Sequence, residues 1–216
     1  MLLLAFDTAT AAVTVALHDG RRVIARESAH AGHQHGELLA ACIAAVLRSA
    51  DAAPADLTAV AAGTGPGPYT GLRAGLVTAR VLSSALAIRA DGVCTLDVIA
   101  AEAAAAAAGR EFIVATDARR KEVYWARYSP AGERLAGPEV ARPAQLPAGI
   151  PVAGPAALLY SEIAGPPMPP RYPDAGRLAE LAASGRAAGA PPAALEPLYL
   201  RRPDAREPGR PKRVTA

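Results

Sequence analysis

The stretch of sequence that decides the fold is Gly63-Thr-Gly-Pro-Gly-Pro-Tyr-Thr-Gly-Leu-Arg-Ala-Gly-Leu-Val-Thr-Ala-Arg80. Its first six residues include three glycines and two prolines, and the residues from Thr70 onward have the apolar spacing of a helix. Glycine adopts backbone angles that other residues avoid, and proline fixes its own φ and lacks an N–H donor. The sequence therefore predicts a rigid, sharply turned loop leading into a helix N-terminus. Such a terminus either seats an anion or serves as a tight structural turn.

The helix predicted over residues 70–88 carries small residues four positions apart. Gly71, Gly75 and Ala79 alternate with Leu72 and Leu76. Small side chains let another helix approach closely, so this face packs either against the preceding helix of the same chain or against another subunit. The loop is not a Walker A motif, because no lysine follows its glycines.

Residues upstream of this loop predict an antiparallel meander followed by an amphipathic helix. Strands are expected at 2–6, 12–17 and 22–28, with His18-Asp-Gly20 as a hairpin turn. A further strand is expected at 58–62. The helix is expected over 34–50, where an apolar stripe comprises Leu38, Leu39, Cys42, Ile43, Val46 and Leu47.

The downstream half predicts a second, smaller lobe. We expect a first lobe over residues 1–108, a second over 109–202 and a basic, disordered tail over 203–216. The predicted strands are 91–95, 112–116, 122–128 and 151–153, the predicted helices are 96–108, 156–163 and 176–184, and an extended piece covers 196–201.

The charge distribution weakens a nucleic-acid interpretation. The 216 residues carry a formal charge of +3, whereas residues 201–216 alone carry +4, so the rest of the chain carries −1. The basicity belongs to the tail, which either solubilises the chain or contacts RNA phosphates. A freestanding RNA-binding module is further disfavoured because only 4% of the residues are aromatic.

Cysteine usage and apolar runs favour a cytoplasmic protein. Cys42 and Cys94 form no metal-ligand spacing, which suits a reducing compartment. The apolar start of the chain has no basic leader and meets Asp7 too early for a signal peptide. No run reaches the roughly 20 apolar residues of a membrane helix.

Residues typical of catalytic centres form no recognisable constellation. His30, His33 and His35 could hold a metal ion, but they lack the spacing of a helical zinc motif and a nearby cysteine pair, so we interpret them as loop or helix-start residues. No serine lies in a Gly-x-Ser-x-Gly context. We therefore predict no catalytic residue and no metal site.

The early turn and the glycine loop are the pieces of an actin-like nucleotide fold. Asp7 follows the first strand, where such folds place a carboxylate, but the turn Asp7-Thr-Ala-Thr10 lacks the glycine that lets a phosphate approach the backbone. A working ATP site is therefore doubtful. The candidate nucleotide-contacting residues are Asp7, Thr8, Thr10, Gly63, Gly65 and Gly67.

Four segments together resemble the TsaB (YeaZ) family. They are Asp7-Thr-Ala-Thr10, Gly63-x-Gly-Pro-Gly-x-Tyr-Thr-Gly-Leu-Arg73, Asp117-Ala-Arg119 with Glu122-Val-Tyr-Trp125, and Glu196-Pro-x-Tyr-Leu-Arg201. The resemblance runs from residue 3 to about residue 201. It implies a two-lobed actin-like (ASKHA) α/β fold with mixed sheets, and a role in making threonylcarbamoyladenosine beside the anticodon of tRNA in bacteria.

The resemblance also implies that the chain is a non-catalytic accessory subunit. The catalytic relative, TsaD, holds a metal ion with a His-x-x-x-His pair on the helix after the fifth strand of its first lobe. Here the matching helix begins Leu96-Asp-Val-Ile-Ala-Ala-Glu102 and contains no histidine. We expect the chain to hold no cofactor of its own. Whether a nucleotide binds at the boundary of the complex stays open.

In that family the subunits pair through first-lobe helices, here 34–50 and 70–88. The implied partners are a TsaD-type subunit, a second copy when TsaD is absent, a TsaE-type ATPase in the assembled complex, and tRNA only through the complex; no membrane is involved. Gly75→Leu is then expected to abolish TsaD binding and leave the monomer folded. The candidate interface residues are Leu38, Leu39, Cys42, Ile43, Val46, Tyr69, Gly71, Leu72, Gly75, Leu76 and Ala79.

Two other functions stay open at this point. Asp7 and the glycine loop favour an active ATP-binding enzyme of the same fold, whereas the missing glycine in the first turn opposes it. A protease-regulating or chaperone-like partner protein is the other alternative. No catalytic Cys/His set supports cleavage by this chain itself.

Overall fold

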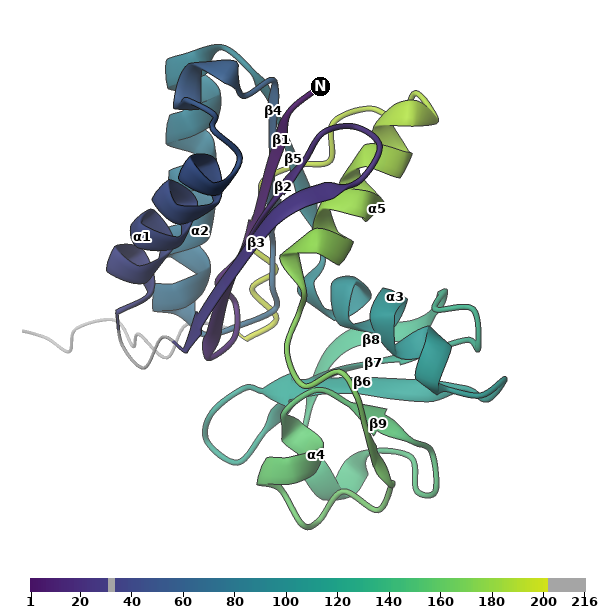
Figure 1. Cartoon of the computed structure of the whole chain (residues 1–216). Helices are drawn as coiled ribbons and strands as arrows, with labels where there is room; N and C mark the ends of the chain where they lie inside the picture. The colour runs from purple at the N-terminus through teal and green to yellow at the C-terminus, as the bar shows by residue number, and fades with distance from the viewer. Residues whose placement is uncertain (31–33, 202–216) are drawn as a thin grey trace, which may run out of the picture.

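Two five-stranded sheets organise the chain, as a computed structural model of residues 1–30 and 34–201 describes it. The first sheet has the strand order β3-β2-β1-β4-β5 and the second the order β10-β9-β6-β7-β8. Figure 1 places the first sheet in the upper lobe and the second in the lower lobe. The strands are β1 (Leu3–Asp7), β2 (Ala12–His18), β3 (Val23–His30), β4 (Ala59–Gly63), β5 (Arg89–Val93), β6 (Phe112–Asp117), β7 (Val123–Tyr128), β8 (Arg134–Ala141), β9 (Val152–Ala153) and β10 (Pro167–Met168).

The first sheet begins with the predicted meander. Strand β1 pairs antiparallel with β2, and β2 pairs antiparallel with β3, which confirms this part of the sequence prediction. Strand β4 then pairs parallel with β1, and β5 pairs parallel with β4. The parallel strands end at the same edge of the sheet, so Asp7 and Gly63 meet there.

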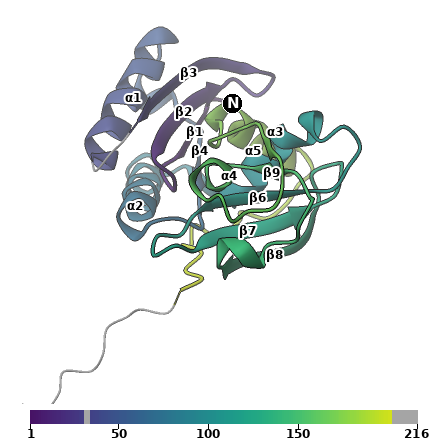
Figure 2. The same cartoon turned by 90° about the horizontal axis from the view of Figure 1, so that it is seen from below.

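Helices cover both faces of the first sheet (Figures 1 and 2). Leu4 and Phe6 pack toward α1 and α2, whereas Leu3 and Ala5 pack toward α5 on the opposite face. This division follows from the strand period of two, which sends successive side chains to opposite faces. The helices are α1 (His35–Ser49), α2 (Tyr69–Leu86), α3 (Thr95–Ala106), α4 (Ala156–Leu159) and α5 (Ala175–Ala187), with short 3-10 turns at Pro54–Asp56 and Pro143–Gln145.

Helix α3 joins the two lobes. Its Val98 belongs to the core beside β1 and β4, whereas Leu96 and Ile99 pack with Phe112 and Tyr128 of the second sheet. Both faces of α3 are therefore apolar and buried, as its alanine-rich sequence allows.

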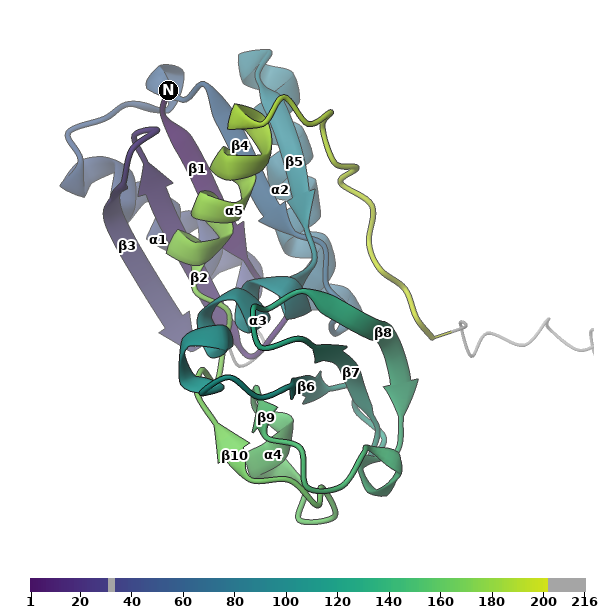
Figure 3. The same cartoon turned by 90° about the vertical axis from the view of Figure 1, so that its right-hand side faces the viewer.

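The end of the described chain returns to the first lobe. Leu178 and Ala179 of α5 pack against the first sheet, although the sequence pattern predicts 109–202 as the second lobe. The following segment, residues 190–201, runs along β5 (Figure 3). Its backbone bonds β5 and the glycine loop: Gly92 N–H donates to the Ala193 carbonyl at 3.0 Å, and Leu198 N–H donates to the Thr64 carbonyl at 2.9 Å. The predicted tail, 203–216, lies outside the described residues.

Several predicted boundaries need correction. Strand β5 and helix α3 begin earlier than predicted, and α4 ends at Leu159 instead of residue 163. Strands β8 and β10 were absent from the prediction, because the prolines and glycines around them indicate turns. Within the described residues, no helix has the length and apolar content needed to cross a bilayer.

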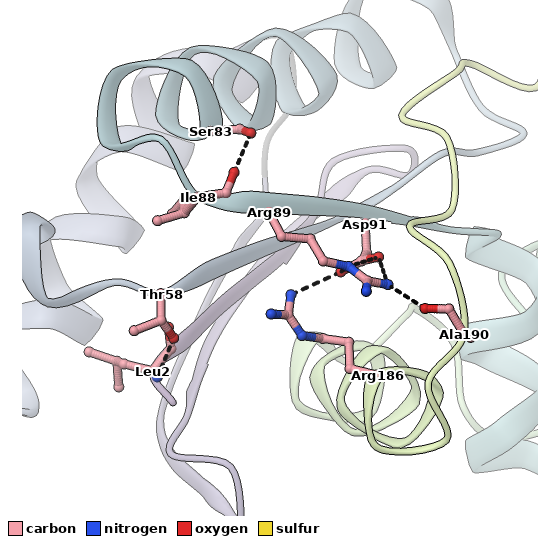
Figure 4. Close-up of polar contacts among 8 residues, drawn as sticks. All are labelled: Leu2, Thr58, Ser83, Ile88, Arg89, Asp91, Arg186 and Ala190. Carbon is pink, nitrogen blue, oxygen red and sulfur yellow. Dashed lines mark hydrogen bonds and ion pairs between the residues drawn. The ribbon is translucent and has the colours of Figure 1, made fainter.

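A buried carboxylate holds β5 to the end of α5 (Figure 4). Asp91 is almost fully buried and accepts from Arg89 at 2.6 Å and from Arg186 at 3.1 Å. The Arg89 guanidinium also donates to the Ala190 carbonyl at 3.2 Å. The carboxylate thus connects the sheet edge, the last turn of α5 and the start of the 190–201 segment.

Replacing Asp91 by alanine should destabilise the chain by about 3 kcal/mol, because both guanidinium groups lose the buried carboxylate that neutralises them. Urea unfolding followed by circular dichroism measures this loss. The exposed Asp51→Asn is the control and should stay within about 0.5 kcal/mol, since asparagine tolerates the positive φ at this position. Equal stability of the two variants would contradict the stabilising role of the buried Asp91 carboxylate.

Candidate functional site

The glycine loop lies directly against the turn that follows β1. A Cβ atom added at Gly63 would collide with the Asp7 carboxylate, and one added at Gly67 would collide with the Ala9 carbonyl. At Gly71, the first turn of α2, it would lie 2.5 Å from the Thr8 carbonyl oxygen. The glycines are therefore required for close contact between two backbone segments of the same chain.

Asp7 is fully buried at this junction, where it is hydrogen-bonded by two neighbours. The Ala9 N–H donates to Oδ1 at 2.7 Å, and the Thr95 hydroxyl donates to Oδ2 at 2.6 Å. Thr95 also accepts from the Gly65 N–H at 3.1 Å and donates its own N–H to the Gly65 carbonyl at 2.8 Å. Burial raises the pKa of the Asp7 carboxyl, and the two hydrogen bonds partly oppose that shift.

The two threonines of the turn are also used internally. The Thr8 hydroxyl donates to the Gly71 carbonyl at 2.8 Å. The Thr10 carbonyl lies 2.9 Å from Nε2 of His35, the first residue of α1. The structure thus brings the candidate nucleotide-contacting residues into one buried junction, where Asp7, Thr8, Thr10 and Gly65 already form hydrogen bonds within the chain. This junction fixes the N-terminal ends of α1 and α2 relative to β1.

Most of the candidate interface residues face the chain's own core. Eight of them are buried, because they form the seam of α1 and α2 against the first sheet: Leu39, Cys42, Val46, Gly71, Leu72, Gly75, Leu76 and Ala79. Leu38 and Ile43 are partly buried against the same core, and Tyr69 is exposed.

The same packing contradicts the expectation that a Gly75→Leu monomer would stay folded. A Cβ atom at Gly75 would lie 2.5 Å from the Thr8 hydroxyl oxygen. A leucine there would disturb the fold itself, so this substitution does not test subunit binding. The small residues Gly71 and Gly75 therefore allow α2 to pack closely against the turn after β1.

The outer side of α2 carries a different set of side chains, of which the sequence analysis named only Tyr69. Tyr69, Val77 and Val81 are 58%, 52% and 59% exposed. The Arg73 guanidinium lies 4.9 Å from the centre of the Tyr69 ring, which stacks on Tyr199 of the 190–201 segment at 5.7 Å. We call Tyr69, Arg73, Val77 and Val81 the outer stripe of α2. Their spacing of four residues could have identified this side of the helix from the sequence, but the interface was assigned mainly to the opposite side because of its glycines.

The remaining candidates for chemistry lie apart. His30 ends β3 with its ring edge-on to Tyr172, His35 begins α1, and His33 lies outside the described residues. In the described ranges, no three His, Cys, Asp or Glu side chains gather as a metal site. Burial raises the pKa of the Cys94 thiol to about 11, so it is a poor nucleophile.

Gly67→Ala should destabilise the chain by about 2 kcal/mol, because the added methyl group overlaps the Ala9 carbonyl. Gly36→Ala is the matched control: a Cβ atom there meets nothing within 4 Å, and alanine favours the helix by up to about 1 kcal/mol. Thermal and urea unfolding compare the two variants. A stable Gly67→Ala variant would show that the loop and the turn are not in close contact.

The Asp7 carboxyl should make stability pH-dependent in a defined direction. Because burial raises its folded pKa above the ordinary value of an aspartate, the folded chain keeps a proton over a pH range in which the unfolded chain has released it. Stability from this group is full below the unfolded pKa and is lost as the pH rises through the folded pKa. Asp7→Asn cannot titrate, so its stability relative to the wild type should increase over that rise. Urea unfolding across about pH 4 to 7 measures the difference, and a constant difference would contradict the raised pKa.

Comparisons with known proteins agree with this geometry. The family model described as TsaD, tRNA N6-adenosine threonylcarbamoyltransferase, matches residues 27–187. An uncharacterized protein of Mycobacterium tuberculosis is 42% identical over 212 residues, which cover 94% of this chain and 93% of that protein. The Escherichia coli protein named tRNA threonylcarbamoyladenosine biosynthesis protein TsaB is 34% identical over 128 residues, covering 59% of this chain and 55% of that protein.

Two solved structures from Pseudomonas aeruginosa extend the likeness to the whole fold. YeaZ superposes with a TM-score of 0.75 at 29% identity, covering 92% of this chain and 99% of the other. A protein described as similar to peptidase YeaZ gives a TM-score of 0.80 at 28% identity, covering 93% and 99%. The predicted two-lobed actin-like (ASKHA) α/β fold is confirmed. The chain belongs to the TsaD family, in its TsaB (YeaZ) branch.

Proposed function

We propose that the chain is a non-catalytic accessory subunit in the biosynthesis of threonylcarbamoyladenosine in tRNA, where it binds and supports a TsaD-type threonylcarbamoyltransferase. Its membership in the TsaB branch supports the pathway. The observation that carries the binding role is the outer stripe of α2, which exposes large apolar side chains on a helix whose opposite side is buried against its own sheet.

The outer stripe has the composition of an interface. Val77 and Val81 leave half of their surface in water, although a neighbouring helix that covered them would gain about 25 cal/mol per Å² of apolar surface. Tyr69 and Arg73 add an aromatic ring and a guanidinium, two groups that are enriched at interface hot spots. Exposed Ala40 and Ala41 of α1 leave room for a close approach. The partner surface would be a pair of helices with a complementary apolar stripe.

The non-catalytic part of the proposal rests on residues of this chain. Helix α3 contains no histidine, so it lacks the His-x-x-x-His pair that the resemblance implies for the catalytic relative. The junction of the glycine loop and the Asp7–Thr10 turn uses its polar groups for internal hydrogen bonds. In this proposal the junction positions α2 for docking and takes no part in group transfer.

The proposed assembly is cytoplasmic, and Cys42 and Cys94 are free thiols in keeping with a reducing compartment. Without a TsaD-type partner, the outer stripe would pair with that of a second copy. A TsaE-type ATPase would join the assembled complex, and tRNA would be reached through the complex. Any nucleotide would sit at the boundary of the complex, with no cofactor held by this chain alone.

Replacing both Val77 and Val81 by glutamate should weaken binding to a TsaD-type subunit at least tenfold, because the interface would bury two unpaired charges. The monomer should keep its thermal stability, since both side chains point to solvent. Isothermal titration calorimetry measures the affinity, and circular dichroism checks the fold.

The matched control is Leu158→Glu combined with Leu159→Glu, which adds the same two charges at other exposed apolar positions, on α4 of the second lobe. This variant should bind like the wild type. Affinity of the double variant within twofold of the control would rule out docking through the outer stripe.

A further inference from the structure

The tip of the hairpin between β6 and β7 has an unusual backbone. Its residues Arg119, Arg120 and Lys121 have φ angles of 61°, 55° and 60°. Residues with a side chain rarely adopt this left-handed region, because the Cβ atom crowds the following carbonyl oxygen. Among the described residues, this is the longest run of positive φ angles, and it contains no glycine. We call these three residues the cationic turn.

Neighbouring contacts hold the cationic turn in this conformation. The Ala118 N–H donates to the Glu122 carbonyl, and the Glu122 N–H donates to the Arg119 carbonyl, both at 3.0 Å. The Asp117 carboxylate accepts from the Arg119 N–H and from the Tyr160 hydroxyl, both at 2.8 Å. The hairpin therefore requires left-handed residues at its tip, but it does not require arginine or lysine. Glycine would adopt the same backbone without strain, so the cations need an explanation outside the fold.

The positive charge of the turn exceeds the negative charge beside it. All three cationic side chains are exposed. The Asp117 carboxylate lies 3.5 Å from the Arg119 guanidinium, and the Glu122 carboxylate pairs with Arg201. Residues 117–122 carry three cations and two acids, and Arg201 adds a fourth cation, so this surface has a formal charge of +2. Such a surface attracts a polyanion.

The cationic turn is linked to the start of the outer stripe. Arg201, which pairs with Glu122 at the end of the turn, follows two residues after Tyr199. Tyr199 in turn stacks on Tyr69, the first residue of α2. The 190–201 segment thus connects the turn to the end of α2 at which the outer stripe begins. A subunit docked on the outer stripe would bring the tRNA that it holds close to the turn.

We propose that the cationic turn contacts the phosphate backbone of tRNA directly when this chain is docked on a TsaD-type subunit. Arginine and lysine bind the phosphates of any base sequence, and such contacts fix the position of a nucleic acid without reading it. This role suits a subunit that takes no part in group transfer. The inference rests on the proposed function, which supplies the RNA. An acidic surface of the docked subunit is the competing partner.

Arg120→Gly combined with Lys121→Gly removes two cations and relieves the strained backbone, so this glycine variant should melt at the wild-type temperature or above it. Binding of tRNA to the full chain alone is measured by fluorescence anisotropy over a series of salt concentrations. The slope of log affinity against log salt should become shallower by about 1.5, because each lost phosphate contact contributes about 0.7–0.9. Asparagine at both positions also tolerates this backbone and should give the same slope.

The matched control is Arg21→Gln combined with Arg22→Gln, which removes two exposed cations from the hairpin between β2 and β3. This hairpin lies at the opposite end of the first sheet from the glycine loop, since His18 beside it pairs with Leu3 at the start of β1. The control should keep the wild-type salt slope. The basic residues of 203–216 are common to all the proteins compared, so they do not affect the difference.

Calorimetric titration with a TsaD-type subunit in the absence of RNA separates the two partners. The glycine variant should bind this subunit like the wild type, while the assembled complex should lose affinity for tRNA. Equal salt slopes of the glycine variant and the control would overturn the proposal. A loss of affinity for the subunit without RNA would also overturn it, because the turn would then contact protein. If no complex forms, the proposed function fails, whereas the tRNA measurement on the chain alone still tests the turn.

Discussion

The close backbone contact between the Asp7–Thr10 turn and the glycine loop is the constraint on which the first lobe depends. The Ala9 carbonyl occupies the space that a Cβ atom at residue 67 would need, so only glycine fits there. The Thr8 hydroxyl donates to the Gly71 carbonyl at the start of α2. Asp7 and Thr95 extend these contacts to the start of α3, which packs on both lobes. One buried junction therefore fixes the first sheet, α2 and the helix between the lobes.

This junction also decides which side of α2 is available. The small residues of the helix are buried by the turn after β1, so the helix can turn only its opposite side to solvent. That side carries Tyr69, Val77 and Val81. The 190–201 segment supports it at one end, where Tyr199 stacks on Tyr69. A loop that resembles a phosphate-binding element thus acts, in our proposal, as the support of a docking helix.

The sequence predicted the order of the main elements because their signals are local. Alternating strands, the stripe of α1 and the Gly-Pro loop depend on neighbouring residues, and the motif resemblance added the two-lobed fold. Which side of each helix faces the core was harder to predict. Gly71 and Gly75 resemble a subunit interface in sequence, yet they contact Thr8, which lies more than 60 residues away in the chain.

The most direct test of the central claim is reconstitution of tRNA modification with a TsaD-type subunit, the other components of the pathway, and tRNA, in the presence and absence of this chain. Threonylcarbamoyladenosine in the tRNA is measured by mass spectrometry of nucleosides. Our account predicts modification only when this chain is present, and none from this chain when the TsaD-type subunit is left out. Equal modification without this chain would contradict the account.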